Sequence, residues 1–507
     1  MSQELCPVLV DGEWRAAVAF GSFLAEDPAT GTPLDVQYPK SEWSDVEAVI
    51  AAAAKAAEIM QEMPAQTIAD FLNAYADDIE AHAVAISEQA ALETGYPVKP
   101  RLQDVELPRT TGQLRQAAMA AGDASWRLPT IDAANKIASI LEPVGPVVVF
   151  GPNNFPLAFN GIAGGDFAAA IAAGNPVIAK AHSSHPGTCK LLAECALRAA
   201  QKTGMPAGAV QMIFGISRAD GEKLVRDGRI GAVAFTGSRT AGMALKASAD
   251  AVGKPIYLEM SSVNPVVILP GALAERSADI AGELVTSALM GTGQFCTNPG
   301  LIFLVAGEAT EGFLAELAEK YTAQPCGTLL SKGTQQGLVE GIEALVAGGA
   351  EVVCGGRPAA RPGYAWSNTL LRVDGKHFLA DPEKLQTEAF GNATLVVIAE
   401  SLEQLPSLIC GCEGNLTGCI YSALDGRDDA AYAPVARLLR ARVGRLLNDK
   451  MPTGVAVSPA MCHGGPFPAT GHPHFTAVGI PAACRRFTRL ACYDNVRPDR
   501  LPVALRS

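Results

Sequence analysis

Three polar residues stand where apolar runs of the sequence end, and their types suit covalent catalysis. Cys296 closes the glycine-rich turn Gly293-Gln-Phe-Cys296, where a loop can expose a nucleophilic thiol. Glu259 ends the apolar run Pro255–Leu258, where a carboxylate can act as a general base. Asn154 follows another such run, where its amide can donate to an oxyanion. Each residue alone also fits a structural role, as a buried thiol, a solvated strand-end charge or a turn residue.

A fourth segment suits the phosphates of a nucleotide. Phe235-Thr-Gly-Ser238 and Gly242 place small residues where a predicted strand turns into a helix. Free N–H groups and the helix dipole attract phosphate at such a helix start. The spacing matches neither the GxGxxG fingerprint nor a Walker loop, since Ala244 and Leu245 follow Gly242. Alone, this segment is weak evidence for nucleotide binding.

Short apolar strands alternate with helices around these segments, which predicts parallel sheets wound on both faces, with ligands at the carboxyl ends of the strands. Residues 40–100 and Arg109–Ala121 are predicted to be helical. A second alternating series begins at Pro265–Leu269 and continues through the strand Leu301–Val305. The first series has predicted strands at Pro146–Phe150, Asn175–Ala179, Val210–Phe214 and Gly231–Phe235.

Composition excludes several classes of function. The net charge is −12 and no basic stripe appears, which argues against a nucleic-acid partner. Prolines, glycines and amides interrupt the uncharged stretches 143–165 and 284–307, so neither predicts a membrane span. Met1–Pro7 contains Glu4 and no apolar segment follows it, which argues against a secretory leader. The twelve cysteines then suit a reducing compartment, so we expect a cytoplasmic protein.

The histidines raise the question of a metal site. His182 and His185 lie close in the sequence, as do His463, His472 and His474. Glycine and proline surround them, and no carboxylate is spaced with them as a zinc-ligand pattern requires. We therefore expect loop histidines and no metal.

Six segments in order resemble the aldehyde dehydrogenase superfamily. They are Asn154-Phe-Pro156, Gly174-Asn-Pro-Val-Ile-Ala-Lys180, Phe235-Thr-Gly-Ser238, Leu258-Glu259, Gly293-Gln-Phe-Cys296 and Glu388-Ala-Phe390-Gly391. Three longer segments are similar to one branch of this family, which contains 2-oxoglutarate-semialdehyde (2,5-dioxopentanoate) dehydrogenases and NADP-dependent fatty-aldehyde dehydrogenases. These segments are Gly151–Gly165, Lys180–Gly187 and Gly464–Thr470.

The resemblance implies a catalytic role for each of the first three residues. Cys296 would attack the aldehyde, and the Asn154 amide and the Cys296 N–H would hold the resulting oxyanion. Hydride transfer to a nicotinamide would leave a thioester. Glu259 would then activate the water that hydrolyses this thioester to the carboxylic acid, which divides the work between a soft nucleophile and a carboxylate base.

The resemblance also implies the residues that hold the cofactor. Lys180 would meet the adenosine ribose, and Ser238, beside Gly237, would meet the pyrophosphate. Glu388 would bind the nicotinamide ribose, and Phe390 would pack against the nicotinamide.

Position 183 bears on the choice between NAD and NADP. Family members that prefer NAD often carry glutamate three residues after the lysine, where this chain has Ser183. A glutamate there would repel a 2′-phosphate, whereas serine can donate to it. Arg218 or His182 would supply positive charge nearby. We therefore expect a preference for NADP, or use of both cofactors. A second departure is Glu259-Met-Ser-Ser262, where many members have Glu-Leu-Gly-Gly.

Substrate choice depends on whether the aldehyde carries a carboxylate. An arginine at the substrate tunnel would bind it, because the guanidinium fork matches a carboxylate. Arg109 and Arg115 are the candidates, with surface arginines as the alternative interpretation. Phe155 and Phe159 are expected to line the tunnel.

The implied fold has two doubly wound α/β domains, nucleotide-binding and catalytic, with a small β oligomerisation element. The nucleotide-binding domain would take residues 1–120 and 143–263, and the catalytic domain residues 264–460. The oligomerisation element would take residues 121–142 and 480–507, in a homodimer or homotetramer. We expect oxidation of 2-oxoglutarate semialdehyde. The alternatives are a medium- or long-chain aldehyde dehydrogenase, a CoA-acylating relative, which would lack the base that Glu259 supplies, and an inactive relative that only binds nucleotide.

Overall fold

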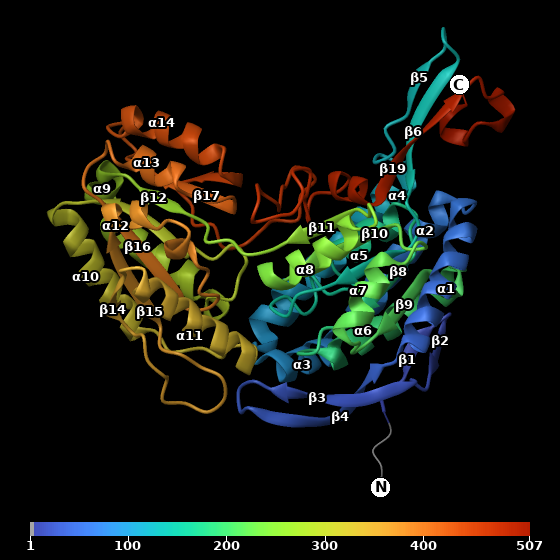
Figure 1. The fold of residues 1–507 in the computed structure, drawn as a ribbon, viewed down its shortest axis with the longest axis horizontal. Coiled ribbons are helices and arrows are strands. Elements are labelled where there is room, and N and C mark those ends of the chain that lie inside the picture. Colours follow the sequence, from blue (N-terminus) through green and yellow to red (C-terminus); the bar gives the residue numbers. More distant parts are fainter. Residues whose placement is uncertain (1–4, 507) are drawn as a thin grey trace.

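The computed structural model describes residues 5–506, so part of the Met1–Pro7 segment lies outside the described residues. Two seven-stranded sheets, a three-stranded sheet and a two-stranded hairpin make up the strand content. Figure 1 shows the two large sheets in separate lobes, with the three-stranded sheet projecting from one of them. Within residues 5–506, no helix is both long enough and apolar enough to cross a membrane.

The first large sheet carries the predicted nucleotide-binding strands in the order β11-β10-β7-β8-β9-β1-β2. Its strands from β11 to β9 pair in parallel, as predicted, and β1 and β2 pair antiparallel at the edge. The antiparallel edge was not predicted, because each of its strands has only three residues. The strands are β1 (Val8–Val10), β2 (Glu13–Arg15), β7 (Val147–Phe150), β8 (Val177–Lys180), β9 (Val210–Ile213), β10 (Ala232–Thr236) and β11 (Ile256–Glu259).

Helices cover this sheet, and several are rich in alanine, which allows them to pack closely. Ser217 and Ser238 cap two of them by accepting a hydrogen bond from a backbone N–H of the first turn. The helices are α1 (Trp43–Gln61), α2 (Ala65–Ala81), α3 (Ala83–Thr94), the π-helix η1 (Val98–Glu106), α4 (Leu107–Asp123), α5 (Gly165–Ala172), α6 (Pro186–Thr203), η2 (Ala207–Ala209), α7 (Arg218–Arg226) and α8 (Arg239–Asp250).

The second large sheet has the order β14-β15-β16-β13-β12-β17-β18 and is parallel except for β14. Along β13, Leu301 and Phe303 join one apolar cluster, whereas Ile302 and Leu304 join another. Both faces of the sheet are therefore buried, as a doubly wound sheet requires. The strands are β12 (Val266–Ile268), β13 (Leu301–Val305), β14 (Glu351–Cys354), β15 (Thr369–Asp374), β16 (Ala393–Ala399), β17 (Asn415–Tyr421) and β18 (Val443–Asn448).

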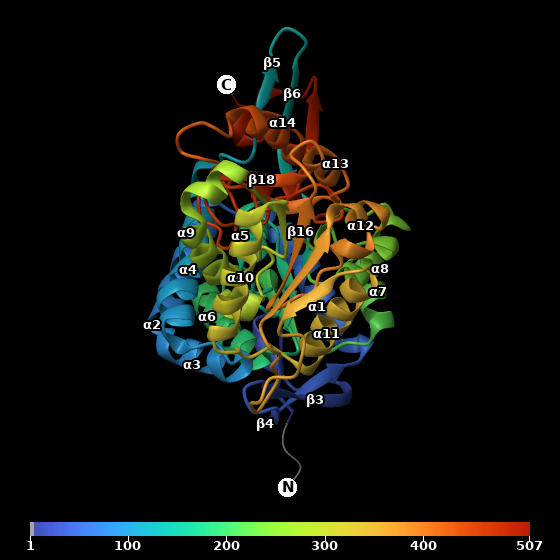
Figure 2. The same ribbon diagram turned by 90° about the vertical axis from the view of Figure 1, so that its left-hand side faces the viewer.

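Helices pack around this second sheet in the other lobe (Figure 2). They are α9 (Pro270–Leu289), η3 (Met290–Gly293), α10 (Glu308–Ala323), α11 (Lys332–Ala347), α12 (Gly375–Ala380), η4 (Lys384–Gln386), α13 (Leu405–Cys410) and α14 (Asp429–Arg440).

Segments far apart in the chain form the projecting sheet, in the order β19-β6-β5 (Figure 1). Ile131 and Leu490 expose about half and two thirds of their surface on these strands. The predicted oligomerisation segments thus meet in one sheet, while its role and the predicted domain bounds stay predictions. The strands are β5 (Thr130–Asp132), β6 (Ile137–Pro143) and β19 (Thr488–Asp494), with the short helices η5 (Ala482–Phe487), η6 (Pro498–Arg500) and η7 (Val503–Leu505) nearby.

The hairpin of β3 (Ala19–Asp27) and β4 (Thr32–Ser41) reaches across to the second lobe. The Tyr364 hydroxyl donates to Glu26 Oε2 over 2.7 Å, and Tyr364 N donates to the carbonyl of Pro28. The hairpin therefore joins the lobes on the side opposite the projecting sheet (Figure 1).

A buried ion pair attaches the C-terminal segment to the first lobe. Arg486 Nη2 of η5 lies 2.7 Å from Asp166 Oδ1 of α5, and both side chains are less than a tenth exposed. The guanidinium also packs over the rings of Phe475 and Phe487. Breaking one side of such a pair leaves an unpaired charge in a dry environment.

We expect Arg486→Met to lower the free energy of unfolding by about 3–5 kcal/mol, because Asp166 loses its partner. Urea unfolding followed by circular dichroism measures the loss. The double variant Arg486→Met/Asp166→Leu should lose less than the single variant. The control Arg489→Met removes a largely exposed partner of Glu142 and should change stability by less than about 1 kcal/mol. Equal losses in Arg486→Met and Arg489→Met would contradict the assignment.

Candidate active site

The loop that carries Cys296 is shaped by close backbone contacts. It follows η3, and Gly293 has φ 68°, in the left-handed region. A Cβ on Gly293 would lie 2.1 Å from the carbonyl oxygen of Gly391. This position therefore accepts only glycine, and the thiol that follows is held at the interface of the two lobes.

Gln294 fixes this loop with all of its polar groups. The side chain is fully buried, donates to the carbonyls of Gly291 and Thr328, and accepts from Leu330 N. Its backbone carbonyl accepts a hydrogen bond of 2.9 Å from Asn154 Nδ2. One N–H of Asn154 thus orients the side chain and a second remains to donate to a ligand.

Cys296, Glu259 and His463 form a buried cluster. Cys296 Sγ lies 3.4 Å from His463 Nε2, and the same nitrogen lies 3.1 Å from Glu259 Oε1. His463 and Glu259 are each about 1% exposed, and Glu259 Oε2 has no hydrogen-bond partner among residues 5–506. Burial, followed by the charge of Glu259, raises the pKa of Cys296 well above its usual range, while Arg109 opposes this shift. These surroundings therefore favour the protonated form of the isolated thiol.

A cavity of about 580 Å³ extends from this cluster along the carboxyl ends of β7, β8, β10 and β11. Cys296, Glu259 and Asn154 line one part of it. The predicted cofactor residues that also line it are Lys180, Gly237, Ser238, Glu388 and Phe390. The sequence-predicted catalytic residues and these five cofactor residues thus share one cavity.

The lining of this cavity suits a dinucleotide. The free N–H groups at the start of α8 open onto it beside Ser238. A Cβ at Gly237 would lie 2.8 Å from the Phe235 ring, so the turn excludes a side chain there. Burial raises the pKa of Glu388 to about 7. Its carboxylate accepts from Ser262 N, over 3.4 Å to Oε1, and from the Ser261 side chain. Since each carboxylate oxygen has two lone pairs, the group can still accept from a ribose hydroxyl.

The other predicted cofactor residues lie differently. Ser183 is exposed and lines an adjoining hollow of about 420 Å³, which it shares with Lys180, Lys40 and Glu26. Burial, with the charges of His185 and Lys180, holds the pKa of His182 well below its usual range. His182 lines the main cavity, but its burial disfavours the positive charge that the sequence analysis expected there. Arg218 is exposed at the first turn of α7 and lines neither cavity.

Aromatic rings surround the other side of Cys296. The Phe155 ring packs edge-on against Phe159 and Phe295, with centroids 5.3 and 5.1 Å away. Arg109 lies over the rings of Phe155 and Phe159, and its Nη1 donates to the carbonyl of Val455 over 2.9 Å. Its Nε and Nη2 are buried without a partner in the part of the chain that the structure describes. Such a guanidinium is ready to bind an anion.

The structure separates the two predicted substrate arginines. Arg115 is exposed and pairs with Asp77 and Glu80 of α2, so it contacts none of the residues around Cys296. Arg115 is therefore a surface arginine, as in the alternative interpretation of the sequence. Arg101, which the sequence did not single out, lies over the rings of Phe155 and Phe295 instead. Glu106 holds it there, and Arg101 Nη2 donates to the Asn154 carbonyl.

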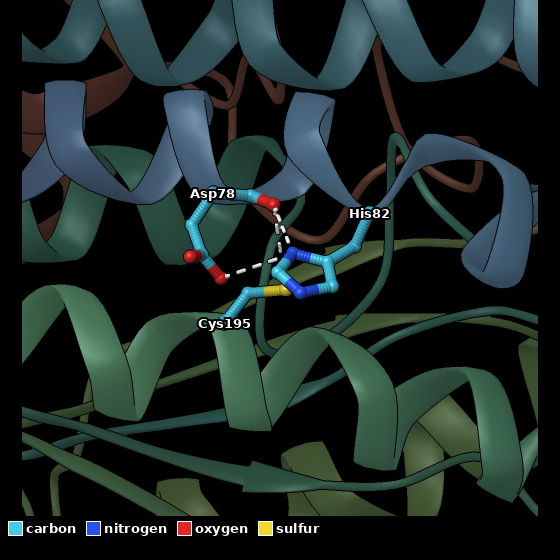
Figure 3. A group of neighbouring side chains, drawn as sticks. All are labelled: Asp78, His82 and Cys195. Atoms are coloured by element: carbon cyan, nitrogen blue, oxygen red, sulfur yellow. Dashed lines mark hydrogen bonds and ion pairs between the residues drawn. The ribbon is translucent and has the colours of Figure 1, made fainter.

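One group of potential metal ligands lies in the first lobe, away from Cys296. Figure 3 shows the His82 ring beside Asp78 and Cys195, on α2 and α6. Arg198 Nη2 donates to Asp78 Oδ2 and to Cys195 Sγ, at 2.7 and 3.2 Å. A guanidinium thus already provides the positive charge that these side chains attract.

The sequence analysis expected His463 to be a loop histidine and did not place it beside Cys296 and Glu259, where the structure has it. It lies 167 residues from Cys296, in a segment without helix or strand. His463 N donates to Thr476 Oγ1, and the His463 carbonyl accepts from Ala477 N, which holds the ring against Phe159. Its one sequence signal is its place directly before the family-like segment Gly464–Thr470.

Comparison with solved structures identifies the fold. The described chain superposes on a crystal structure of lactaldehyde dehydrogenase from Escherichia coli with a TM-score of 0.84 and 20% identity, covering 96% of this chain and 98% of that one. A structure of PnpE in complex with nicotinamide adenine dinucleotide gives a TM-score of 0.82 at 21% identity, covering 97% and 98%.

Two curated relatives are more similar to this chain in sequence than these two solved structures are. Alpha-ketoglutaric semialdehyde dehydrogenase 2 of Azospirillum brasilense is 39% identical over 514 residues, which cover 99% of this chain and 97% of the relative. An alpha-ketoglutaric semialdehyde dehydrogenase of Acinetobacter baylyi is 38% identical over 486 residues, covering 94% and 91%. Residues 14–441 match the model of the aldehyde dehydrogenase family. The chain therefore belongs to the aldehyde dehydrogenase family, whose members are NAD(P)-dependent oxidoreductases that act on aldehydes.

Proposed function

We propose that this enzyme oxidises 2-oxoglutarate semialdehyde to 2-oxoglutarate and uses NADP in preference to NAD or beside it. The single observation that carries the substrate is Arg109, a buried guanidinium with two unpartnered nitrogens among aromatic rings beside the thiol. The two relatives at 38–39% identity, both named alpha-ketoglutaric semialdehyde dehydrogenases, support the same substrate.

The sulfur of Cys296 attacks the aldehyde carbon, a C–S bond forms, and the π electron pair of the carbonyl moves to its oxygen. The free N–H of Asn154 and the backbone N–H of Cys296 stabilise this oxyanion. NAD(P)⁺, when bound, supplies the hydride acceptor that makes the step an oxidation. Glu259 removes a proton from the water that attacks the thioester, and the C–S bond then breaks to release the acid.

The cavity that runs from Cys296 to Lys180 would hold the cofactor. The start of α8 with Ser238 would bind the pyrophosphate, and Lys180 would meet the adenosine ribose. Glu388 and Phe390 would hold the nicotinamide end. The adjoining hollow would take a 2′-phosphate, to which Ser183 can donate and for which Lys40 and Lys180 would supply positive charge in place of His182.

The substrate extends from the thiol toward the aromatic rings. Its carboxylate lies at the end of the molecule remote from the aldehyde, and Arg109 binds it with the unpartnered Nε and Nη2. A medium- or long-chain aldehyde is the second candidate, since Phe155, Phe159 and Phe295 present an apolar lining. Without an anion, however, such a substrate would leave the Arg109 charge uncompensated.

The enzyme assembles as a homodimer or homotetramer through the projecting sheet, whose exposed Ile131 and Leu490 suit burial against a second copy.

Absorbance at 340 nm tests the function directly, with NADP and NAD each supplied with 2-oxoglutarate semialdehyde, pentanal or a long-chain aldehyde. We expect the highest kcat/KM for the oxo-acid aldehyde with NADP. Higher kcat/KM for the long-chain aldehyde would overturn the substrate, and equal or higher kcat/KM with NAD would overturn the cofactor preference.

Cys296→Ser should reduce turnover by more than about 10³-fold, because a serine hydroxyl is a far weaker nucleophile than a thiolate. Binding of NADPH, followed by its fluorescence, should persist, since Cys296 contributes only one wall of the cofactor cavity. Full activity in this variant would refute the covalent mechanism.

Ser183→Glu should lower kcat/KM with NADP by about tenfold or more relative to NAD, because a carboxylate repels the 2′-phosphate. Ser183→Gln is the matched control, of the same size without the charge, and should change this ratio much less. A similar change in both variants would mean that size, not charge, acts at this position.

Arg109→Met should lower the ratio of kcat/KM for 2-oxoglutarate semialdehyde to that for pentanal by about 10- to 100-fold, because a charged hydrogen bond to the carboxylate is lost. Using this ratio cancels effects on the thiol itself. The control Arg115→Met removes a surface arginine and should leave the ratio unchanged. An unchanged ratio in Arg109→Met would assign the carboxylate to another group.

A further inference from the structure

His463 occupies an unusual place, because one of its ring nitrogens contacts both the nucleophile and the base. Nε2 lies 3.4 Å from Cys296 Sγ and 3.1 Å from Glu259 Oε1. All three side chains offer an atom within 4.8 Å of the others. No other imidazole in the described chain lies this close to the thiol.

The backbone around His463 holds the ring rigidly. Its N–H and carbonyl are bound by Thr476 and Ala477, and the ring packs on Phe159. The two residues that follow are glycines in tight contact. A Cβ on Gly464 would lie 2.1 Å from the Phe475 carbonyl oxygen, and one on Gly465 would lie 2.2 Å from the Asn415 carbonyl oxygen. The segment is therefore shaped to bring the imidazole to this position.

The roles proposed for Cys296 and Glu259 require a separate proton acceptor beside the sulfur. A thiol must lose its proton before it attacks a carbonyl. Burial and the negative Glu259 oppose that loss, and Glu259 must stay free to activate water in the second half of the reaction. A neutral imidazole accepts the proton without adding negative charge next to the new thiolate.

We propose that His463 is a catalytic residue that takes the Cys296 proton on Nε2. The S–H bond breaks, its electron pair stays on sulfur, and the imidazolium that forms lies between the thiolate and the Glu259 carboxylate. When the thioester is hydrolysed, the C–S bond breaks and the leaving thiolate recovers this proton from Nε2. The proposal rests on the proposed role of Cys296 as nucleophile.

Other charged groups that face the thiol bear on its pH dependence. Glu259 and Glu388 favour the protonated form of Cys296, and Arg109 favours the thiolate. Arg445 lies near enough to interact with the thiolate as well. All four remain in a His463 variant, so a difference in pH profile between wild type and variant reports on His463.

The test measures alkylation of Cys296 by uncharged iodoacetamide between pH 6 and pH 10, without cofactor or aldehyde. Mass spectrometry of the Cys296 peptide separates this thiol from the exposed ones, such as Cys410 and Cys492. We expect His463→Gln to lower the alkylation rate by about 10- to 100-fold at pH 7, with the difference shrinking toward pH 10, and to lower kcat by about 10²-fold. His474→Gln, the same change at an exposed histidine of the same segment, should match wild type.

A second variant guards against a folding defect. His463→Ala leaves space for free imidazole, which should restore part of the alkylation rate at pH 7, and NADPH binding shows that the cavity is intact. Unchanged alkylation, or a loss of equal size at every pH without recovery in imidazole, would overturn the role. Alkylation needs no substrate, so this result is independent of whether 2-oxoglutarate semialdehyde is the aldehyde oxidised.

Discussion

The hydrogen bond from Asn154 Nδ2 to the carbonyl of Gln294 joins the two lobes at the reacting thiol. Asn154 follows β7 of the first sheet, whereas Gln294 precedes Cys296 on a loop of the second lobe. Neither lobe alone contains both the nucleophile and the side-chain amide proposed to donate to the oxyanion. The buried Gln294 side chain fixes this loop through hydrogen bonds to Gly291, Thr328 and Leu330. Because its carbonyl also binds Asn154, the position of the thiol depends on how the two lobes are placed relative to each other.

The C-terminal segment supplies the third part of the site. It leaves β18, passes between the lobes and ends in the projecting sheet (Figure 1). The buried Arg486–Asp166 pair attaches it to α5, and the glycines after His463 let its backbone lie against Phe475 and Asn415. The same segment that extends toward a predicted subunit interface thereby carries the imidazole to Cys296. Stability of this segment and reactivity of the thiol are consequently linked through one stretch of chain.

How much of the structure the sequence could predict depends on how far apart in the chain the interacting residues lie. Strands such as β13 are continuous apolar runs, so the local pattern predicts them. The polar residues at strand ends, such as Glu259, can then be predicted to lie at the edge of the sheet. His463 has no such pattern, because its role depends on contacts with residues 167 or more positions away. Arg109 and Arg115 lie six residues apart on α4, which places them about 120° apart around the helix. Helical geometry predicts that they face differently, but only the packing of α4 shows which one faces the rings.

Charge balance connects the substrate, the thiol and His463. Burial lowers the pKa of Arg109 and raises that of Cys296, so each charged form depends on a compensating neighbour. Arg109 is one such neighbour for the thiolate before the substrate arrives. Once a substrate carboxylate binds Arg109, that positive charge is neutralised at the moment when the thiolate is needed. A proton taken up by His463 places a new positive charge 3.4 Å from sulfur, which replaces the charge that substrate binding removes.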